Sequence, residues 1–163
     1  MVPYTRRTLL ASALMLAGTA LAQQPAPTFA GQTIVKSGSV AAIAGPAANF
    51  TGRVRVDPLT AANDSINAST AYVTFEPGAR SAWHTHPQGQ YLIVTHGAGL
   101  TQEWGKLVQQ LHAGDVVWCP PGVKHWHGAA QNTALTHIAV TGNQAGKTVQ
   151  WAEKVSDEQY RSQ

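Results

Sequence analysis

Two clusters of histidines in this chain have spacings that suit a metal site. His84 and His86 are separated by one residue, and in an extended strand the side chains at i and i+2 point to the same face. Gln90 follows a turn at Pro87 and Gly89, so its amide can swing back toward the two imidazoles. A His-x-His pair on its own is more often part of a polar strand face than a metal site, so this cluster alone is weak evidence for a metal site.

The second cluster lies about one hairpin further along the chain. His125 follows the turn Pro120-Pro121-Gly122, and His127 falls on the same strand face as His125. Imidazole is the commonest biological metal ligand, and three imidazoles with one side-chain oxygen suit a divalent ion. We therefore predict a metal site with these ligands: His84, His86, Gln90 and His125.

Both clusters resemble the two cupin motifs. The first motif, Gly-x5-His-x-His-x3-(Glu or Gln)-x6-Gly, matches in register from Gly78 to Gly97. The second, Gly-x5-Pro-x-Gly-x2-His, matches from Gly114 to His125, although Ala129 stands where the family usually has Asn. The resemblance implies an all-β cupin fold, which is a double-stranded β-helix or jelly-roll barrel.

Shorter segments are similar to the small bacterial cupins with (R)-selective hydroxynitrile (mandelonitrile) lyase activity. These segments begin at Phe75, Trp83, Lys124, Thr136 and Glu153. The resemblance implies reversible cleavage of cyanohydrins to an aldehyde and cyanide, with Mn²⁺ as the metal and His127 and His137 as acid/base residues. The ligand types alone would equally suit Fe²⁺, Co²⁺, Ni²⁺ or Zn²⁺.

Several residues outside the ligand register are expected to face the same cavity. An unliganded imidazole near a metal has a lowered proton affinity, so His127 and His137 suit a neutral base near pH 7. The alternative is that each merely orients a ligand. Ala71 and Val73 share one face of an alternating strand, and with Thr141 they form the expected substrate pocket.

Three functions remain open at this point. The first is a metal-dependent lyase of the hydroxynitrile type. The second is a metal-dependent cupin dioxygenase or other oxidoreductase, although Gln90, being neutral, leaves the ion's charge uncompensated and disfavours oxidation of iron. The third is a non-catalytic cupin that binds a small metabolite.

Composition excludes some classes of partner. The chain has 163 residues, of which 44% are hydrophobic and 12% charged, as in a compact domain. Its net charge of +3 depends on Arg6 and Arg7, and no basic run remains elsewhere, so we expect no nucleic-acid binding. Cys119 is the only cysteine, which excludes an internal disulfide.

The first 22 residues have the pattern of a signal peptide. Arg6 and Arg7 precede an apolar stretch from Leu9 to Ala22, which is shorter than the roughly 20 residues needed to span a bilayer. The signal-peptide pattern predicts export to the periplasm, with no membrane attachment after processing, and the arginine pair favours the twin-arginine route. We expect a flexible N-terminus over residues 23–33 and a cupin domain over residues 34–163.

In the rest of the chain, apolar and polar residues alternate over short stretches, as in short β-strands. We expect strands near 53–56, ending at Asp57-Pro58, and near 71–76, 91–95, 107–111, 115–118, 125–127 and 134–141, with Gly97 and Gly99 breaking the third of these. Ser156 and Gln159 predict the start of a short C-terminal helix. Trp83 and Trp126 are offset from the inward histidines and should face a second layer or a subunit contact, which favours a homo-oligomer, a dimer or tetramer.

Overall fold

The structure is a computed structural model that describes residues 31–161, with a compact unit that begins at Ile34. The predicted signal peptide, its arginine pair, and residues 23–30 of the predicted N-terminus lie outside the described residues. Within the described part of the chain, no helix is long and apolar enough to cross a membrane.

The unit is built from strands and one short helix, as predicted. Their bounds are β1 Ile43–Ala44, β2 Phe50–Thr51, β3 Val54–Thr60, β4 Ala68–Phe75, β5 Arg80–Ser81, β6 His84–Thr85, β7 Gln90–Glu103, β8 Gln109–His112, β9 Val116–Cys119, β10 His125–Ala129, β11 Leu135–Gly142, β12 Gln150–Trp151 and α1 Asp157–Arg161.

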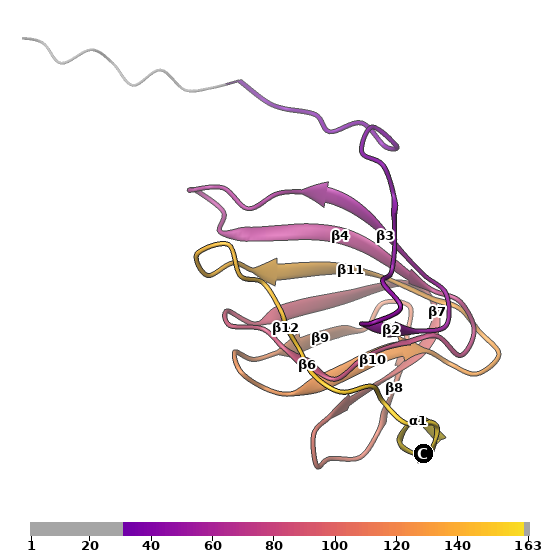
Figure 1. Ribbon diagram of the computed structural model, residues 1–163. Helices are drawn as coiled ribbons and strands as arrows, with labels where there is room; N and C mark the ends of the chain where they lie inside the picture. The colour runs from indigo at the N-terminus through magenta and orange to yellow at the C-terminus, as the bar shows by residue number, and fades with distance from the viewer. Residues whose placement is uncertain (1–30, 162–163) are drawn as a thin grey trace, which may run out of the picture. The chain divides into compact units, whose positions relative to one another are not determined.

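All strand pairs are antiparallel and join into one curled sheet. The main order is β1-β3-β4-β11-β7-β10-β5-β2, while β8 and β9 pair with β7, β6 pairs with β10, and β12 pairs with β6. Figure 1 shows β3, β4 and β11 side by side at the top of the view, and the sheet curling round to β10 and β8 below. This arrangement confirms the all-β cupin fold with a short C-terminal helix.

Strand β7 belongs to both halves of the curled sheet. Its first part pairs with β11 and β9, and its last part pairs with β10 and β8. Leu92 and Val94 are buried before a register shift opposite Thr136/His137, whereas Thr101 is buried after it. Because a bulge changes which residues face inward, one strand supplies inward side chains to both halves of the sheet.

The prediction that this strand breaks at Gly97 and Gly99 is wrong, since β7 runs on to Glu103. A Cβ at Gly97 would lie 1.8 Å from the carbonyl oxygen of Ala134, and one at Gly99 would lie 2.3 Å from that of Gly128. The two glycines therefore mark places where neighbouring backbone comes close to β7, and they do not end the strand.

The prediction that a strand ends at Asp57-Pro58 is also wrong, because β3 continues to Thr60. Strand β1 pairs with β3 only at Arg55 and Val56. At Pro58, therefore, the edge of β3 on the β1 side is not paired with β1. Proline is tolerated at such an edge because its missing N–H removes no ladder hydrogen bond there. The ladder to β4 shifts register between Pro58 and Thr60.

A second apolar layer lies on the opposite side of β10 from the buried histidines. Trp83 and Trp126 are 1% and 0% exposed and pack with Leu100, Val155 and Tyr160. The expectation that the two tryptophans face a second layer is therefore confirmed, and that layer is closed by the C-terminal segment of the same chain.

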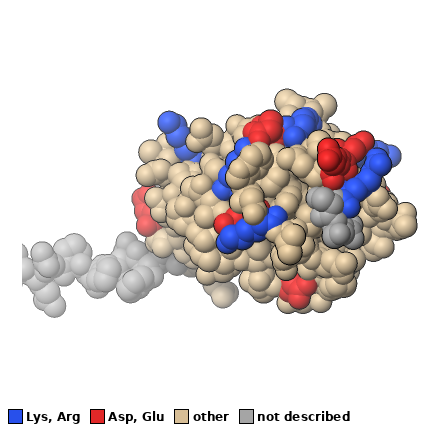
Figure 2. All heavy atoms as spheres, turned by 90° about the horizontal axis from the view of Figure 1, so that it is seen from below, with Lys and Arg blue, Asp and Glu red and all other residues tan. Residues whose placement is uncertain are grey.

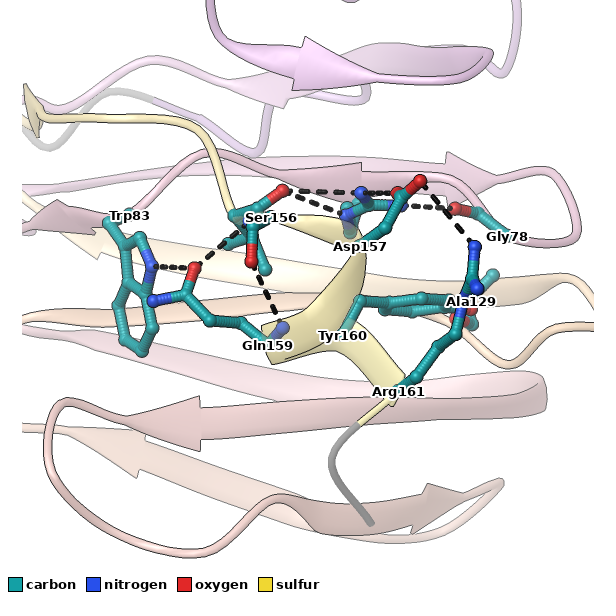
Figure 3. A network of polar contacts seen from close by, with 10 residues as sticks. Gly78, Trp83, Ala129, Ser156, Asp157, Gln159, Tyr160 and Arg161 are labelled. Carbon is teal, nitrogen blue, oxygen red and sulfur yellow. Dashed lines mark hydrogen bonds and ion pairs between the residues drawn. The ribbon is translucent and has the colours of Figure 1, made fainter.

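Helix α1 is held onto this layer by polar contacts, which Figure 3 shows from close by. Gln159 N–H donates to Ser156 Oγ at 3.0 Å and Ser156 N–H donates to Gln159 Oε1 at 2.9 Å, which is the predicted capping box. The buried Arg80 guanidinium donates to the Val155 carbonyl and to Asp157. The Tyr160 hydroxyl donates to the Ala129 carbonyl of β10 at 2.7 Å. These contacts tie the end of the chain to β5 and β10.

The outer face of β4, β7, β9 and β11 is apolar over several strands. On β7 and β9, Trp118 lies opposite Tyr91 and Val116 lies opposite Ile93. Tyr72 of β4 lies in line with Ile93, on the other side of β11. All five side chains are at least one third exposed. On the face drawn in Figure 2, by contrast, acidic and basic side chains are interspersed.

Replacing Tyr160 with Phe should lower the free energy of unfolding by about 1 kcal/mol, because the Ala129 carbonyl loses a buried hydrogen bond. Urea unfolding of the metal-free protein measures the change. Tyr91→Phe, at a ring that is 46% exposed, serves as the matched control and should leave the midpoint unchanged. Equal midpoints for parent and Tyr160→Phe would show that the hydrogen bond adds nothing.

Candidate metal centre and pocket

The predicted metal ligands come from three neighbouring strands and are all buried. His84 begins β6, His86 follows it directly, Gln90 begins β7 and His125 begins β10. His84 and His125 are opposite each other in the β6–β10 pair, and their ring centroids are 4.3 Å apart. The His86 ring lies 5.0 Å from that of His84 and 5.4 Å from that of His125. The fold therefore brings the three imidazoles together.

Each of these imidazoles is oriented by a backbone carbonyl. Nδ1 lies 2.9 Å from the Ala82 oxygen in His84, 2.6 Å from the Thr148 oxygen in His86, and 2.9 Å from the Val123 oxygen in His125. A carbonyl only accepts, so Nδ1 carries the proton in all three rings and Nε2 keeps its lone pair. Metal-binding histidines are held in this way in proteins generally.

Three of the four predicted ligands present a buried acceptor atom that has no hydrogen-bond partner among residues 31–161. These atoms are His86 Nε2, His125 Nε2 and Gln90 Oε1. Unsatisfied buried polar atoms are uncommon, and a missing ion is one accepted explanation. With three neutral nitrogens and an amide oxygen, the donor set suits a divalent cation of the first transition series. The residues present therefore fit a metal ion.

His127 lies closer to this cluster than we predicted for an acid/base residue alone. One ring nitrogen from each of His84, His125 and His127 lies within 4.8 Å of the others, which is close enough for one ion. His125 and His127 share a face of β10, so a position beside the ligands follows from their spacing. The ligand set His84, His86, Gln90 and His125 stays a prediction, because His127, and not His86, completes this close group with His84 and His125.

His127 also contacts the second predicted acid/base residue. His137 Nε2 lies 3.2 Å from His127 Nδ1, so one of the two nitrogens donates to the other. Both rings are buried, and the ring of Phe75 packs within 6 Å of each. The pair forms a short chain of imidazoles that ends at the metal centre.

Burial keeps all five imidazoles neutral. It lowers the pKa of His84, His86 and His127 below the ordinary value of 6.5, and that of His125 and His137 to about 4. The Thr148 carbonyl and the Gln90 amide act in the opposite direction on the pKa of His86. Neutral imidazole is the form that binds metals and accepts protons, so both roles are available at pH 7.

The pocket beside the cluster has a volume of about 180 Å³. Among the described residues that line it, none carries a carboxylate or an ammonium group. The predicted pocket residues Ala71, Val73 and Thr141 all line it, and their role toward a substrate stays a prediction. The remaining lining residues are Phe50, Ser69, His84, His86, Gln90, His127, His137, Ala139, Thr148, Val149 and Trp151.

Sequence reasoning missed the residues that close this pocket from the C-terminal side. Trp151 of β12 lies with its ring 4.9 Å from that of His84 and 5.4 Å from that of Phe50. Thr148 supplies the carbonyl that orients His86. No local pattern marks either residue, because each contact joins segments that are far apart in the chain.

A second cavity of about 260 Å³ contains His125 but none of the other cluster residues. It is lined by parts of β7 and β9, including Cys119, whose thiol pKa is raised by burial to about 12. We place the candidate site in the smaller pocket, because four of the five clustered imidazoles line it. His96 and His112 are exposed, as predicted, and belong to neither cavity.

Comparison with known proteins agrees with this geometry. A cupin domain is recognised over residues 71–141. A protein named (R)-mandelonitrile lyase from Granulicella tundricola is 58% identical over 128 residues, which cover 78% of this chain and 98% of that protein. The name, and the lyase activity that it states, are those of the relative.

Solved structures share the fold. The crystal structure of a cupin-like protein from Thermotoga maritima is 43% identical, with a TM-score of 0.69 over 80% of this chain and 96% of that one. A cupin-2 domain protein from Rhodospirillum rubrum, at 18% identity, has a TM-score of 0.61 over 78% of this chain and 83% of that one. Three buried imidazoles grouped as in a metal site, on this sheet and with these relatives, establish that the chain belongs to the cupin family.

Proposed function

We propose that this protein is a divalent-metal-dependent lyase of the hydroxynitrile type, which reversibly cleaves cyanohydrins to an aldehyde and cyanide. The observation that carries the proposal is the His127–His137 pair, which opens into the same pocket as the unpartnered ligand atoms of His86 and Gln90. The relative named (R)-mandelonitrile lyase, at 58% identity, supports the same reaction and an aromatic substrate.

The ligands we propose are His84, His86, Gln90 and His125, with Mn²⁺ as the ion. When bound, the ion would supply Lewis-acid polarisation of the substrate's hydroxyl oxygen. The four protein ligands are all neutral, and none of the described residues that line the pocket has a carboxylate to offset the ion's charge. This environment favours an oxygen that gains negative charge during the reaction.

The histidine pair can move the proton that the reaction releases. His127 Nδ1 faces His137, so Nε2 is the nitrogen left to take the hydroxyl proton of the cyanohydrin. As that proton leaves, the C–O bond becomes a carbonyl and the bond to the nitrile carbon breaks, with its electron pair going to cyanide. His127 then returns the proton to cyanide, while His137 stabilises the transient imidazolium through the shared hydrogen bond.

The pocket walls suit an aromatic substituent. Ala71, Val73 and Ala139 leave space on one side, and the rings of Phe50 and Trp151 border another. A volume of about 180 Å³ lies below the usual range for drug-sized ligands, so the pocket fits a single small ring with its cyanohydrin carbon. The side chains thus favour a compact, uncharged substrate.

We also propose export to the periplasm through the signal peptide at residues 1–22, and assembly into a homo-oligomer. The surface we assign to assembly is the exposed apolar face formed by Tyr72, Tyr91, Ile93, Val116 and Trp118. Burial of such a face by a second copy removes it from water, which favours association. The tryptophans of the second layer, Trp83 and Trp126, are already covered and play no part in that contact.

Substituting His84 or His125 with Ala should reduce bound metal to well under half occupancy, because each removes one of about four metal–ligand bonds. Elemental analysis of the purified protein measures this directly. His112→Ala, at an exposed histidine, is the matched control and should retain the parent's metal content. Full occupancy in both ligand variants would remove the proposed metal centre.

Substituting His127 or His137 with Ala should leave metal content unchanged and lower turnover by about 10²- to 10⁴-fold, the usual contribution of an acid/base residue. His96→Ala, an exposed histidine, controls for nonspecific effects. Loss of metal in His127→Ala would instead make His127 a ligand, with His137 alone moving the proton. Metal-replete variants with full turnover would refute the acid/base assignment.

Turnover by the parent should persist well below pH 6.5, because burial lowers the pKa of His137 to about 4 and that of His127 below its ordinary value. It should be lost as the pH falls toward about 4, where His137 becomes protonated and His125, whose pKa is also about 4, releases the metal. A rate profile with parallel metal analysis separates the two causes. A midpoint at 6.5 or above would contradict a buried neutral base.

Purified protein loaded with Mn²⁺ should release cyanide from racemic mandelonitrile, with preference for the (R) enantiomer, and should consume no O₂. Chiral chromatography and an oxygen electrode measure the two quantities. Chelator-treated protein is the control and should be inactive until Mn²⁺ is restored. Uptake of O₂ with the same substrates would favour a cupin dioxygenase, and binding without turnover would favour a metabolite-binding cupin.

A further inference from the structure

The Gln90 amide can face a metal in only one of its two orientations. Its oxygen accepts and can ligate a cation, whereas its NH₂ group carries two donors and no available lone pair. Exchanging the two by a half turn about the last side-chain bond would replace the ligand with a repelling group. A side chain with two such unlike ends needs something else to fix its direction.

Thr141 is placed to do this. Gln90 Nε2 donates to Thr141 Oγ1 at 2.8 Å, while Gln90 Oε1 is buried and has no partner within the described part of the chain. The two residues are directly opposite each other in the ladder between β7 and β11. The hydroxyl therefore takes its position from strand pairing and does not depend on a bound ligand.

The residue opposite Gln90 on the other neighbouring strand, β9, offers no comparable acceptor. Cys119 lies opposite Gln90 on β9, and burial raises the pKa of its thiol to about 12, so it stays protonated and accepts only weakly. Gln90 and Thr141 are 6% and 9% exposed, so water replaces the hydroxyl poorly. An unpaired amide N–H in this position would carry the full desolvation penalty of a buried donor.

We propose that Thr141 is a positioning residue, which holds the amide nitrogen of Gln90 so that its oxygen faces the ligand nitrogens of the histidines. This inference rests on the proposed metal centre and gives Thr141 a role beyond that of a pocket wall. The Thr141 hydroxyl can also donate, so it anchors the amide in place, and it accepts from Nε2 in the orientation that leaves Oε1 toward the histidines.

Titration of the metal-free full chain with Mn²⁺, followed by calorimetry, tests the role of Thr141 without using activity. Thr141→Val keeps the shape of the side chain and removes the acceptor, so Mn²⁺ affinity should fall about tenfold or more, as for other residues that orient a ligand. Thr141→Ser retains the hydroxyl and should bind within about threefold of the parent. Circular dichroism and thermal unfolding confirm that both variants fold.

The same substitution in a Gln90→Glu background separates orientation from packing. A carboxylate has two equivalent oxygens and no wrong end, so Thr141→Val should there weaken Mn²⁺ binding by less than about threefold. Unchanged affinity in Thr141→Val, or an equal loss in both backgrounds, would overturn the positioning role while leaving the metal centre intact. Failure of the parent chain to bind Mn²⁺, Fe²⁺, Co²⁺, Ni²⁺ or Zn²⁺ would overturn the metal centre and this inference with it.

Discussion

The structure depends on burying five imidazoles side by side within one curled sheet. A charged imidazole in this place would be poorly solvated and would repel its neighbours, so each ring must be neutral and hydrogen-bonded. The protein meets this requirement with main-chain carbonyls at Ala82, Val123 and Thr148, and with the contact between His127 and His137. Carbonyls are rigidly placed by the fold, so they fix both the tautomer and the direction of each lone pair.

The requirement explains features of the fold that lie outside the pocket. β7 crosses from one half of the sheet to the other. Its bulge lets Gln90 and Thr101 both face inward, although residues an odd number of positions apart face opposite sides of a regular strand. Gly97 and Gly99 allow the close backbone approach that this crossing needs. On the far side, the C-terminal segment covers Trp83 and Trp126, so β10, which carries His125 and His127, is packed on both faces.

Much of this could be predicted from the sequence, because the information is local. The spacing of His84, His86 and His125 places three rings on inward faces whatever the exact strand ends, and Ser156 with Gln159 fixes the helix start. The errors arose where glycine and proline have two meanings. Gly97 marks close packing within a strand and Pro58 an unpaired edge, and only the neighbouring strands distinguish these cases from a turn.

The contacts that finish the site could not be predicted, because they join distant segments through strand register. Trp151 against His84, the Thr148 carbonyl on His86, and Thr141 on Gln90 each depend on which residues two strands place opposite each other. A one-residue slip of β11 against β7 would turn Thr141 away from the pocket and leave the Gln90 amide without its acceptor.

The same register argument separates what the cupin fold provides from what this chain adds. The fold supplies the inward histidines, and a divalent ion on neutral ligands can serve several reactions. The residues that line the pocket select among these reactions. His127 and His137 lie within hydrogen-bond distance of each other, Ala71 and Val73 have small side chains, and no described lining residue has a carboxylate to offset the charge of the ion. A pocket of this kind stabilises negative charge that develops on oxygen and holds a base ready to take the proton, and these are the two demands of cyanohydrin cleavage.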